Sequence, residues 1–240
     1  MNWLLLSQNQ VPIIALMHTS SSALLQLLRL SSPALPVGAY AYSQGLESAC
    51  DQGIIENEKA LMQWLTIVLQ QSFLYQELPL FLRLYRAHQA ADLDQQHYWN
   101  AYLLASRETR ELRLEDSQLG MALVRLLKNQ GLTQVIAWQD QECSFATIFS
   151  LACVEWHIDE QAALHGLLWA WLENQVSVAI KLIPLGQTAG QYVLQQLIPL
   201  IDDVITASLD IEDDNIGASC PGLVFASMQH EEQYSRLFRS

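Results

Sequence analysis

SQLGMALVRLLKNQG, residues 117–131, is the stretch that decides the fold class. Its leucines are spaced by three and four: Leu119, Leu123, Leu126 and Leu127. That spacing places their side chains on one face of an α-helix, and Gly131 is a residue type that often ends one. We therefore expect a helix from about residue 117 to residue 131.

The same spacing recurs along the chain, while strand signals are nearly absent. Further apolar stripes lie at Leu24, Leu27 and Leu28; at Leu61, Leu65, Val68 and Leu69; at Leu164, Leu168, Trp171 and Leu172; and at Leu194, Leu197, Ile198 and Ile201. Ser20 and Asp159 can cap the helices that follow them, and residues 184–186 break another boundary. We predict an all-α protein, a single-domain bundle of roughly eight to ten helices with a flexible C-terminal tail.

Composition divides the chain into three parts. Residues 1–20 contain short apolar runs without the basic start of a signal peptide, which indicates an adaptable N-terminal arm. After residue 209 the sequence turns to acids, Gly, Pro and Ser before a short basic end. We expect an N-terminal arm over residues 1–20, a helical domain over residues 21–209, and a C-terminal tail for partner docking over residues 210–240.

Charge and hydropathy restrict the partners. The formal charge of −13 opposes non-specific binding to nucleic acid or to an anionic membrane. No stretch reaches the about 18 unbroken apolar residues that a spanning helix needs. The four scattered cysteines form no C-x-x-C pair and are typical of free thiols in the cytoplasm. With 51% hydrophobic residues, we expect a cytoplasmic protein that presents apolar surface to a protein partner, and neither nucleic acid nor membrane binding.

Active-site signatures are missing. The chain has no G-x-x-x-x-G-K-[ST] and no H-E-x-x-H, so we predict no catalytic residues, no metal ligands and no cofactor. A helical enzyme with a buried acid/His pocket stays open as an alternative. Its pocket would be built from Tyr40, Tyr42 and Glu47, or from Glu155, His157 and Asp159.

Residues 32–47, SPALPVGAYAYSQGLE, are unusual in this leucine-rich chain. Pro36 and a second proline forbid continued helix, and Gly38 supplies a positive φ or room for close backbone approach. We expect a fixed corner followed by a helix from Ala39 onward, with polar side chains four residues apart on one face.

Four blocks of the sequence, taken together, carry a family resemblance. They are SPALPVGAYAYSQGLE (residues 32–47), SRETRELRLEDSQLGMAL (residues 106–123), IPLGQTAGQ (residues 183–191) and YSRLFRS (residues 234–240). These blocks resemble segments of the UreF family of urease accessory proteins. They occur in family order and span nearly the whole chain after residue 20.

The resemblance implies an all-α adaptor that is not an enzyme. Such a protein joins a UreD/UreH-type accessory protein, and recruits and regulates a UreG-type GTPase for GTP-dependent nickel insertion into the urease apoprotein. It also implies a homodimer within that complex. No metal ligand carries over from the matching blocks, and a generic helical interaction module stays open as another alternative.

Candidate partner-binding residues come from all four blocks. They are Pro36, Gly38, Tyr42, Ser43, Gln44 and Glu47; Arg107, Glu108, Glu111 and Arg113; Gln187 and Gln191; and Tyr234, Arg236, Phe238 and Arg239. In the second block the spacing allows Arg107 to pair with Glu111 along one helix, although arginine is also enriched at interfaces. The aromatic and basic last block can insert anchors into a neighbouring protein and become ordered on contact.

Overall fold

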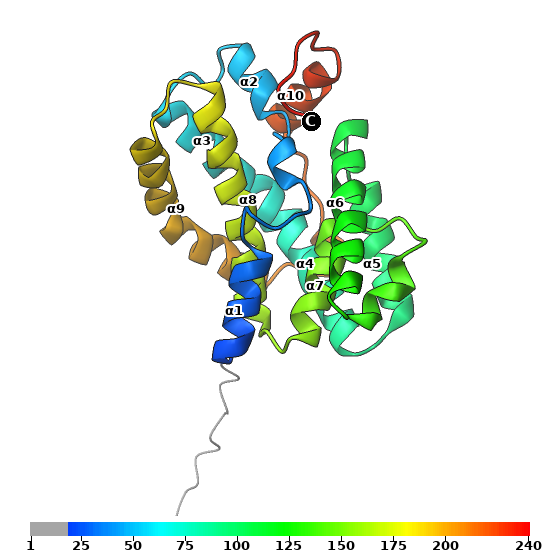
Figure 1. Cartoon of the computed structure of the whole chain (residues 1–240). Helices are drawn as coiled ribbons and strands as arrows, with labels where there is room; N and C mark the ends of the chain where they lie inside the picture. Colours follow the sequence, from blue (N-terminus) through cyan, green and yellow to red (C-terminus); the bar gives the residue numbers. More distant parts are fainter. Residues whose placement is uncertain (1–18) are drawn as a thin grey trace, which may run out of the picture.

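A computed structural model describes residues 19–240, and throughout this range the regular structure is helical (Figure 1). The predicted all-α fold of roughly eight to ten helices is confirmed. Residues 1–18 of the predicted N-terminal arm lie outside the described residues. The α-helices are α1 (Ser21–Leu30), α2 (Leu46–Asp51), α3 (Glu58–Val68), α4 (Leu78–Gln89), α5 (Leu93–Ala105), α6 (Arg110–Asn129), α7 (Phe145–Glu155), α8 (Glu160–Leu182), α9 (Gln187–Ser208) and α10 (Pro221–Glu231).

Helices α3 and α4 are joined without a break by a π-helix, η2 (Leu69–Glu77). Pro79, at the start of α4, has no N–H to donate to the carbonyl of Tyr75, four residues earlier. That carbonyl instead accepts a 2.8 Å hydrogen bond from the Gly217 amide. The wider π-helical turn thus accommodates the proline. It also leaves the Tyr75 carbonyl free to bind the loop that contains Gly217.

The helices pack around one apolar core. In Figure 1, α8 runs through the middle of the molecule, with α9 on one side and α4 to α7 on the other. The predicted stripes supply much of the core, since Leu65, Leu123, Leu168 and Leu197 are all buried. Capping by Ser20 and Asp159 is confirmed: their side chains accept the Ala23 and Ala162 amides. Helical spacing therefore predicts both the elements and most of their buried faces.

Two expectations about helices are wrong in detail. The helix that ends before Gly131 begins at Arg110, not near residue 117, because the Thr109 side chain caps it by accepting the Leu112 amide. In α1 only part of the predicted stripe is buried: Leu27 packs into the core, whereas Leu24 and Leu28 are exposed. Among the described residues α1 packs mainly on α8, and this contact covers only one side of the helix.

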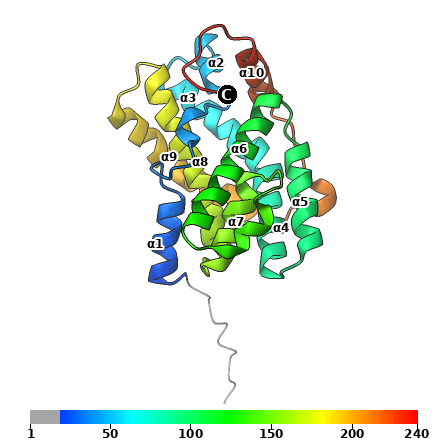
Figure 2. The same ribbon diagram turned by 45° about the vertical axis from the view of Figure 1, so that its right-hand side comes forward.

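Residues 210–240 lie against the helical body. The segment contains a short 3₁₀ turn, η4 (Asp213–Asn215), and then α10, which packs on α2. Both views place α2, α10 and the C-terminal end of the chain together at one end of the molecule (Figures 1 and 2). The boundary at residue 209 and the ordering of this tail on a partner stay predictions.

Candidate protein-binding site

The corner before α2 is more sharply bent than the sequence predicts. Only Ala39–Ala41 form a 3₁₀ turn, after which Tyr42 is extended and Gln44 and Gly45 both have positive φ, 54° and 76°. The expected helix from Ala39 onward is therefore wrong, and α2 starts at Leu46. Of the two roles expected for Gly38, the structure has the positive φ, at 87°, and nothing lies within 4 Å of where its β-carbon would be.

Gly45 is also where α2 meets α10. A β-carbon at this position would lie 2.8 Å from the backbone nitrogen of Ser227, far inside contact distance. The left-handed φ and the close approach both require glycine. The next residues, which form α2, consequently face α10 and the terminal segment, residues 232–240.

Glu47 is the main attachment point of the terminal segment. Its buried carboxylate accepts the Leu237 amide at 2.6 Å and the Phe238 amide at 2.8 Å. The same carboxylate lies 3.2 Å from Nε2 of the fully buried His230. Because hydrogen bonds to a carboxylate are stronger than neutral ones, one glutamate fixes both the end of α10 and the segment after it.

Glu111, in the first turn of α6, completes this ionic cluster. One carboxylate oxygen lies 2.7 Å from Nδ1 of His230, and the other accepts a 2.7 Å hydrogen bond from Nη1 of Arg236. Glu47, Glu111, His230 and Arg236 thus join α2, α6, α10 and the terminal segment. We call these four residues the terminal clasp.

The chain end is held next to the clasp. The Ser43 amide donates to the main-chain oxygen of Ser240 at 2.7 Å, and the Ser240 hydroxyl donates to Glu115 at 2.6 Å. Glu115 also accepts the Gln44 side chain at 2.7 Å. Burial raises the pKa of Glu115 to about 7, against the lowering effect of these hydrogen bonds. The carboxyl group of Glu115 therefore titrates close to neutral pH.

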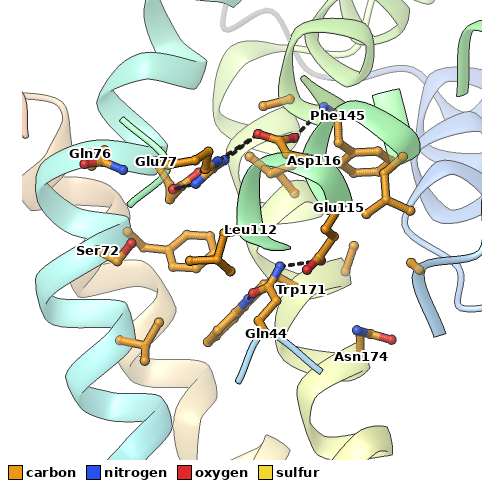
Figure 3. A pocket seen from close by; sticks show the side chains of 18 of the residues that line it. Gln44, Ser72, Gln76, Glu77, Leu112, Glu115, Asp116, Phe145, Trp171 and Asn174 are labelled. Atoms are coloured by element: carbon orange, nitrogen blue, oxygen red, sulfur yellow. Dashed lines mark hydrogen bonds and ion pairs between the residues drawn. The ribbon is translucent and has the colours of Figure 1, made fainter. Parts of the chain in front are cut away.

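A cavity of about 160 Å³ lies beside Glu115, between η2, α6 and α8. Figure 3 shows Glu77 reaching it from η2, Glu115 and Asp116 from α6, and Trp171 and Asn174 from α8. Most of its lining is apolar, and the carboxylates of Glu77, Glu115 and Asp116 add a few polar groups. Such a lining is typical of a binding pocket.

Arg107 is part of a buried ion pair network in the wall of this cavity. Its guanidinium donates to Glu77 at 3.0 Å and to Asp116 at 2.9 Å, and Asp116 also accepts the Phe145 amide at 2.7 Å. The expected pairing of Arg107 with Glu111 is wrong, because Arg107 precedes the first turn of α6 and points into the protein. Arg107 thus ties α6 to η2 and to the start of α7.

Comparison with known protein families matches residues 55–198 to UreF. The chain belongs to the UreF family. It is 47% identical over 218 residues to the urease accessory protein UreF of Hahella chejuensis, covering 91% of this chain and 98% of the relative. It is 49% identical over 223 residues to the urease accessory protein UreF of Teredinibacter turnerae, covering 92% and 100%. The resemblance read from the four sequence blocks is confirmed.

Three of the four blocks of UreF-like sequence meet at the end of the molecule that carries the clasp. The first supplies Glu47, the second Glu111, and the last Arg236, while Tyr234 in the last block is fully exposed. The third block supplies no residue to the clasp: Gln187, at the start of α9, is exposed. Whether these residues bind partners stays a prediction.

The other candidate residues fall into two groups. Tyr42 is buried and donates to Gln118 at 2.6 Å, and the buried Phe238 lies under the ammonium group of Lys181. The rest are at least partly accessible: Pro36, Gly38, Glu108, Arg113, Gln191 and Arg239. Glu108 accepts the Ser219 hydroxyl and Arg113 pairs with Glu142, so both already have partners within the chain.

The alternative enzyme pockets do not form. Tyr40 is 63% exposed, whereas Glu47 is occupied by the terminal segment. Asp159 caps α8 and accepts the Thr19 amide, and His157 is exposed. Within residues 19–240 no three His, Cys, Asp or Glu side chains are grouped so that they could hold a metal ion. None of the helices in that range has the length and apolar character of a membrane span.

Sequence reasoning missed the residues that organise this site from within. His230 lies in a polar run without helical periodicity and gives no signal in the sequence. Glu115 and Asp116 do give one, since they precede Leu119, Gly120 and Leu123 at helical spacing and so extend the buried face of α6. Acidic residues on a predicted core face indicate buried, paired carboxylates.

Proposed function

We propose that this chain is the non-enzymatic adaptor of urease maturation. It joins a UreD/UreH-type accessory protein, recruits and regulates a UreG-type GTPase, and thereby supports GTP-dependent nickel insertion into the urease apoprotein. It acts in the cytoplasm as a homodimer within that complex. The nucleotide chemistry then belongs to the GTPase, in keeping with the absence of a phosphate-binding motif from this sequence.

The observation that supports this proposal best is the meeting of three UreF-like blocks at one end of the protein. Polar and ionic contacts fix the backbone there, while Tyr40, Tyr234 and Leu237 remain exposed. A rigid frame with exposed aromatic and aliphatic side chains is what a protein-binding hot spot requires. The four free cysteines agree with a reducing compartment.

The assembly is tested by co-expressing this chain with the UreD/UreH-type protein and the GTPase of the same organism. Size-exclusion chromatography with light scattering is then run with and without GTP. We expect one stable complex with two copies of each chain. A chain that elutes alone in the presence of both proteins would contradict the proposal.

A point variant separates docking from folding in the same assay. Tyr234→Ala is expected to weaken binding of the UreD/UreH-type protein about tenfold or more, because an exposed aromatic anchor is lost. The matched control is Tyr98→Ala on α5, an exposed tyrosine far from the clasp, which is expected to leave binding unchanged. Equal affinities for both variants, measured by titration calorimetry, would exclude Tyr234 as an anchor. Truncation after Gln233 is less decisive, because it also removes the backbone amides of Leu237 and Phe238, which donate hydrogen bonds to Glu47.

A further inference from the structure

A second hollow lies beside α6, separate from the terminal clasp. Its volume is about 630 Å³, and it is lined by α6, by residues 140–142 before α7, by the corner before α2 and by Arg239. None of the four clasp residues lines it. Its size is comparable to that of ligand pockets in other proteins, roughly 300–1,000 Å³. The hollow can therefore hold a short segment of peptide.

Part of the lining of this hollow is apolar. Val37 and Tyr42 are largely buried in its wall, and Met121 and Ala122 of α6 are half-buried there. The Tyr42 hydroxyl donates to Gln118 at 2.6 Å, which fixes the ring. The methionine side chain, by contrast, is flexible and adapts to apolar groups of different shape. This part of the wall therefore suits an aliphatic or aromatic side chain of a bound segment.

Two arginines in the same wall have no partner within the described chain. Arg125 on α6 and Arg239 in the terminal segment are exposed, and neither side chain forms an ion pair or a hydrogen bond within residues 19–240. Their backbones are nevertheless fixed, because Arg125 lies inside α6 and the Arg239 amide donates to the Ala41 carbonyl at 2.8 Å. Binding of anionic groups here would restrict only the two arginine side chains.

The acidic groups of the lining are already compensated by other cations. Glu142 binds the guanidinium of Arg113 through two hydrogen bonds, of 3.3 and 2.9 Å. Asp140 accepts the side-chain amide of Gln139 at 3.1 Å, and the carbonyl of that side chain accepts Nζ of Lys128 at 2.7 Å. The charges of the two unpaired arginines are therefore left in excess. In a chain with a formal charge of −13, this is a local reversal of sign.

We propose that this hollow is a docking site for an acidic segment of a partner protein. Carboxylates of the segment pair with Arg125 and Arg239, and an apolar side chain between them packs on Tyr42 and Met121. The planar guanidinium group matches a carboxylate in shape and can donate two parallel hydrogen bonds to it. A nucleic acid fits less well, because its long phosphate backbone would also meet the acidic surface around the hollow.

The site is tested by NMR titration of the purified full chain at low salt. No other accessory protein is present, so a failure here leaves the proposed function untouched. The probe is a blocked pentapeptide with two glutamates on each side of a leucine, and its counterpart has lysines in place of the glutamates. We expect the acidic peptide to shift the signals of Met121 and Arg125 and to bind about tenfold or more tightly than the basic one. Added salt is expected to weaken this binding.

Three results of this titration would overturn the proposal. The first is that no signal from the hollow shifts at acidic peptide concentrations up to about 5 mM. The second is that the acidic and basic peptides bind equally well. The third is that a single-stranded oligonucleotide binds the hollow more tightly than the acidic peptide, which would identify a nucleic acid as the occupant.

Charge-reversal variants show whether the two arginines are responsible. Arg125→Glu and Arg239→Glu are each expected to weaken binding of the acidic peptide about tenfold or more, because attraction becomes repulsion. Both side chains are exposed and unpaired among the described residues, so folding is expected to be unaffected. The matched control is Lys59→Glu, which makes the same change of charge on α3, a helix that does not line the hollow. Wild-type affinity in both arginine variants, or an equal loss in the control, would overturn the proposal.

Discussion

Replacing Gly120 by alanine is expected to lower the free energy of unfolding by about 3 kcal/mol. Gly120 lies on the buried face of α6, where that helix crosses the start of α7. A β-carbon there would lie 2.1 Å from the carbonyl oxygen of Cys143 and 2.8 Å from the carbonyl carbon of Ser144. These are backbone atoms, so the clash cannot be relieved by turning a side chain.

The backbone at this crossing is also fixed by its own hydrogen bonds. The Ser144 amide donates to Asn100 at 3.0 Å, and the Ser144 side chain caps α7 by accepting the Thr147 amide at 3.0 Å. Moving the loop away from α6 would break these bonds or leave buried polar groups unpaired. The backbone therefore cannot shift to accommodate the methyl group of alanine, which pushes α6 and α7 apart.

Urea denaturation followed by circular dichroism measures this effect. The control is Gly222→Ala in α10, where the β-carbon would meet only the Trp64 ring at an ordinary 3.7 Å. That variant is expected to change stability by less than about 1 kcal/mol, since alanine favours a helix over glycine. If the two variants are equally stable, the contact between α6 and α7 is not rigid.

Helical periodicity predicted the fold because it is a local property of the sequence. Stripes such as Leu61 with Leu65 mark the buried face of a helix without reference to any other segment. The start of α6 was missed because the charged residues from Arg107 to Arg113 conceal the helical period there. The exposed Leu24 and Leu28 show the opposite limit, since helical spacing does not reveal whether a neighbour covers the stripe.

The site could be predicted only in part. The four blocks indicated which segments matter, but Glu47 and His230 are separated by 183 positions, and nothing in either segment predicts their contact. Arg107 was placed on a helix surface because the Glu111 spacing suits such a pair, whereas Glu77, 30 positions away, is its actual partner. Contacts of this range depend on packing, which a single sequence does not encode as a pattern.

Glu115→Gln is expected to stabilise the protein at alkaline pH and to change it little in acid. Burial raises the pKa of Glu115 from 4.5 to about 7. Below about pH 4.5 the carboxyl group is protonated in both the folded and the unfolded chain, so it does not change the free energy of unfolding. As the pH rises to about 7 the unfolded chain loses the proton first, so the folded state becomes less stable by about 3 kcal/mol.

Glutamine removes this penalty and keeps the contacts. Its carbonyl can accept the Gln44 amide, and its own amide can donate to the Ser240 hydroxyl oxygen. The gain in the free energy of unfolding is expected to be about 3 kcal/mol near pH 8 and about 1 kcal/mol near pH 5. Urea denaturation at the two pH values measures both. Glu56→Gln, at an exposed glutamate, is the control and is expected to have no effect at either pH.

His88 also makes the free energy of unfolding depend on pH. The change of this free energy with pH is therefore a sharper test than its value at a single pH. Burial lowers the pKa of His88 to about 4, so the folded chain resists the proton that the unfolded chain accepts. The stability from neutral His88 is therefore present above about pH 6.5 and is lost as the pH falls toward 4. Glu115 produces the opposite slope over an overlapping range, so the two partly cancel in the wild type.

When Glu115 is replaced, the pH dependence of the free energy of unfolding that His88 causes is no longer cancelled. The free energy of unfolding of Glu115→Gln is expected to rise by about 3 kcal/mol from about pH 4 to about pH 6.5, whereas the wild type stays nearly flat over the upper part of this range. The double variant with His88→Gln is expected to lose that rise, because its glutamine can still donate to the Thr147 carbonyl without titrating. A flat curve for Glu115→Gln alone would mean that His88 accepts a proton in the folded protein as readily as in the unfolded chain, and that its ring is better solvated than its burial indicates.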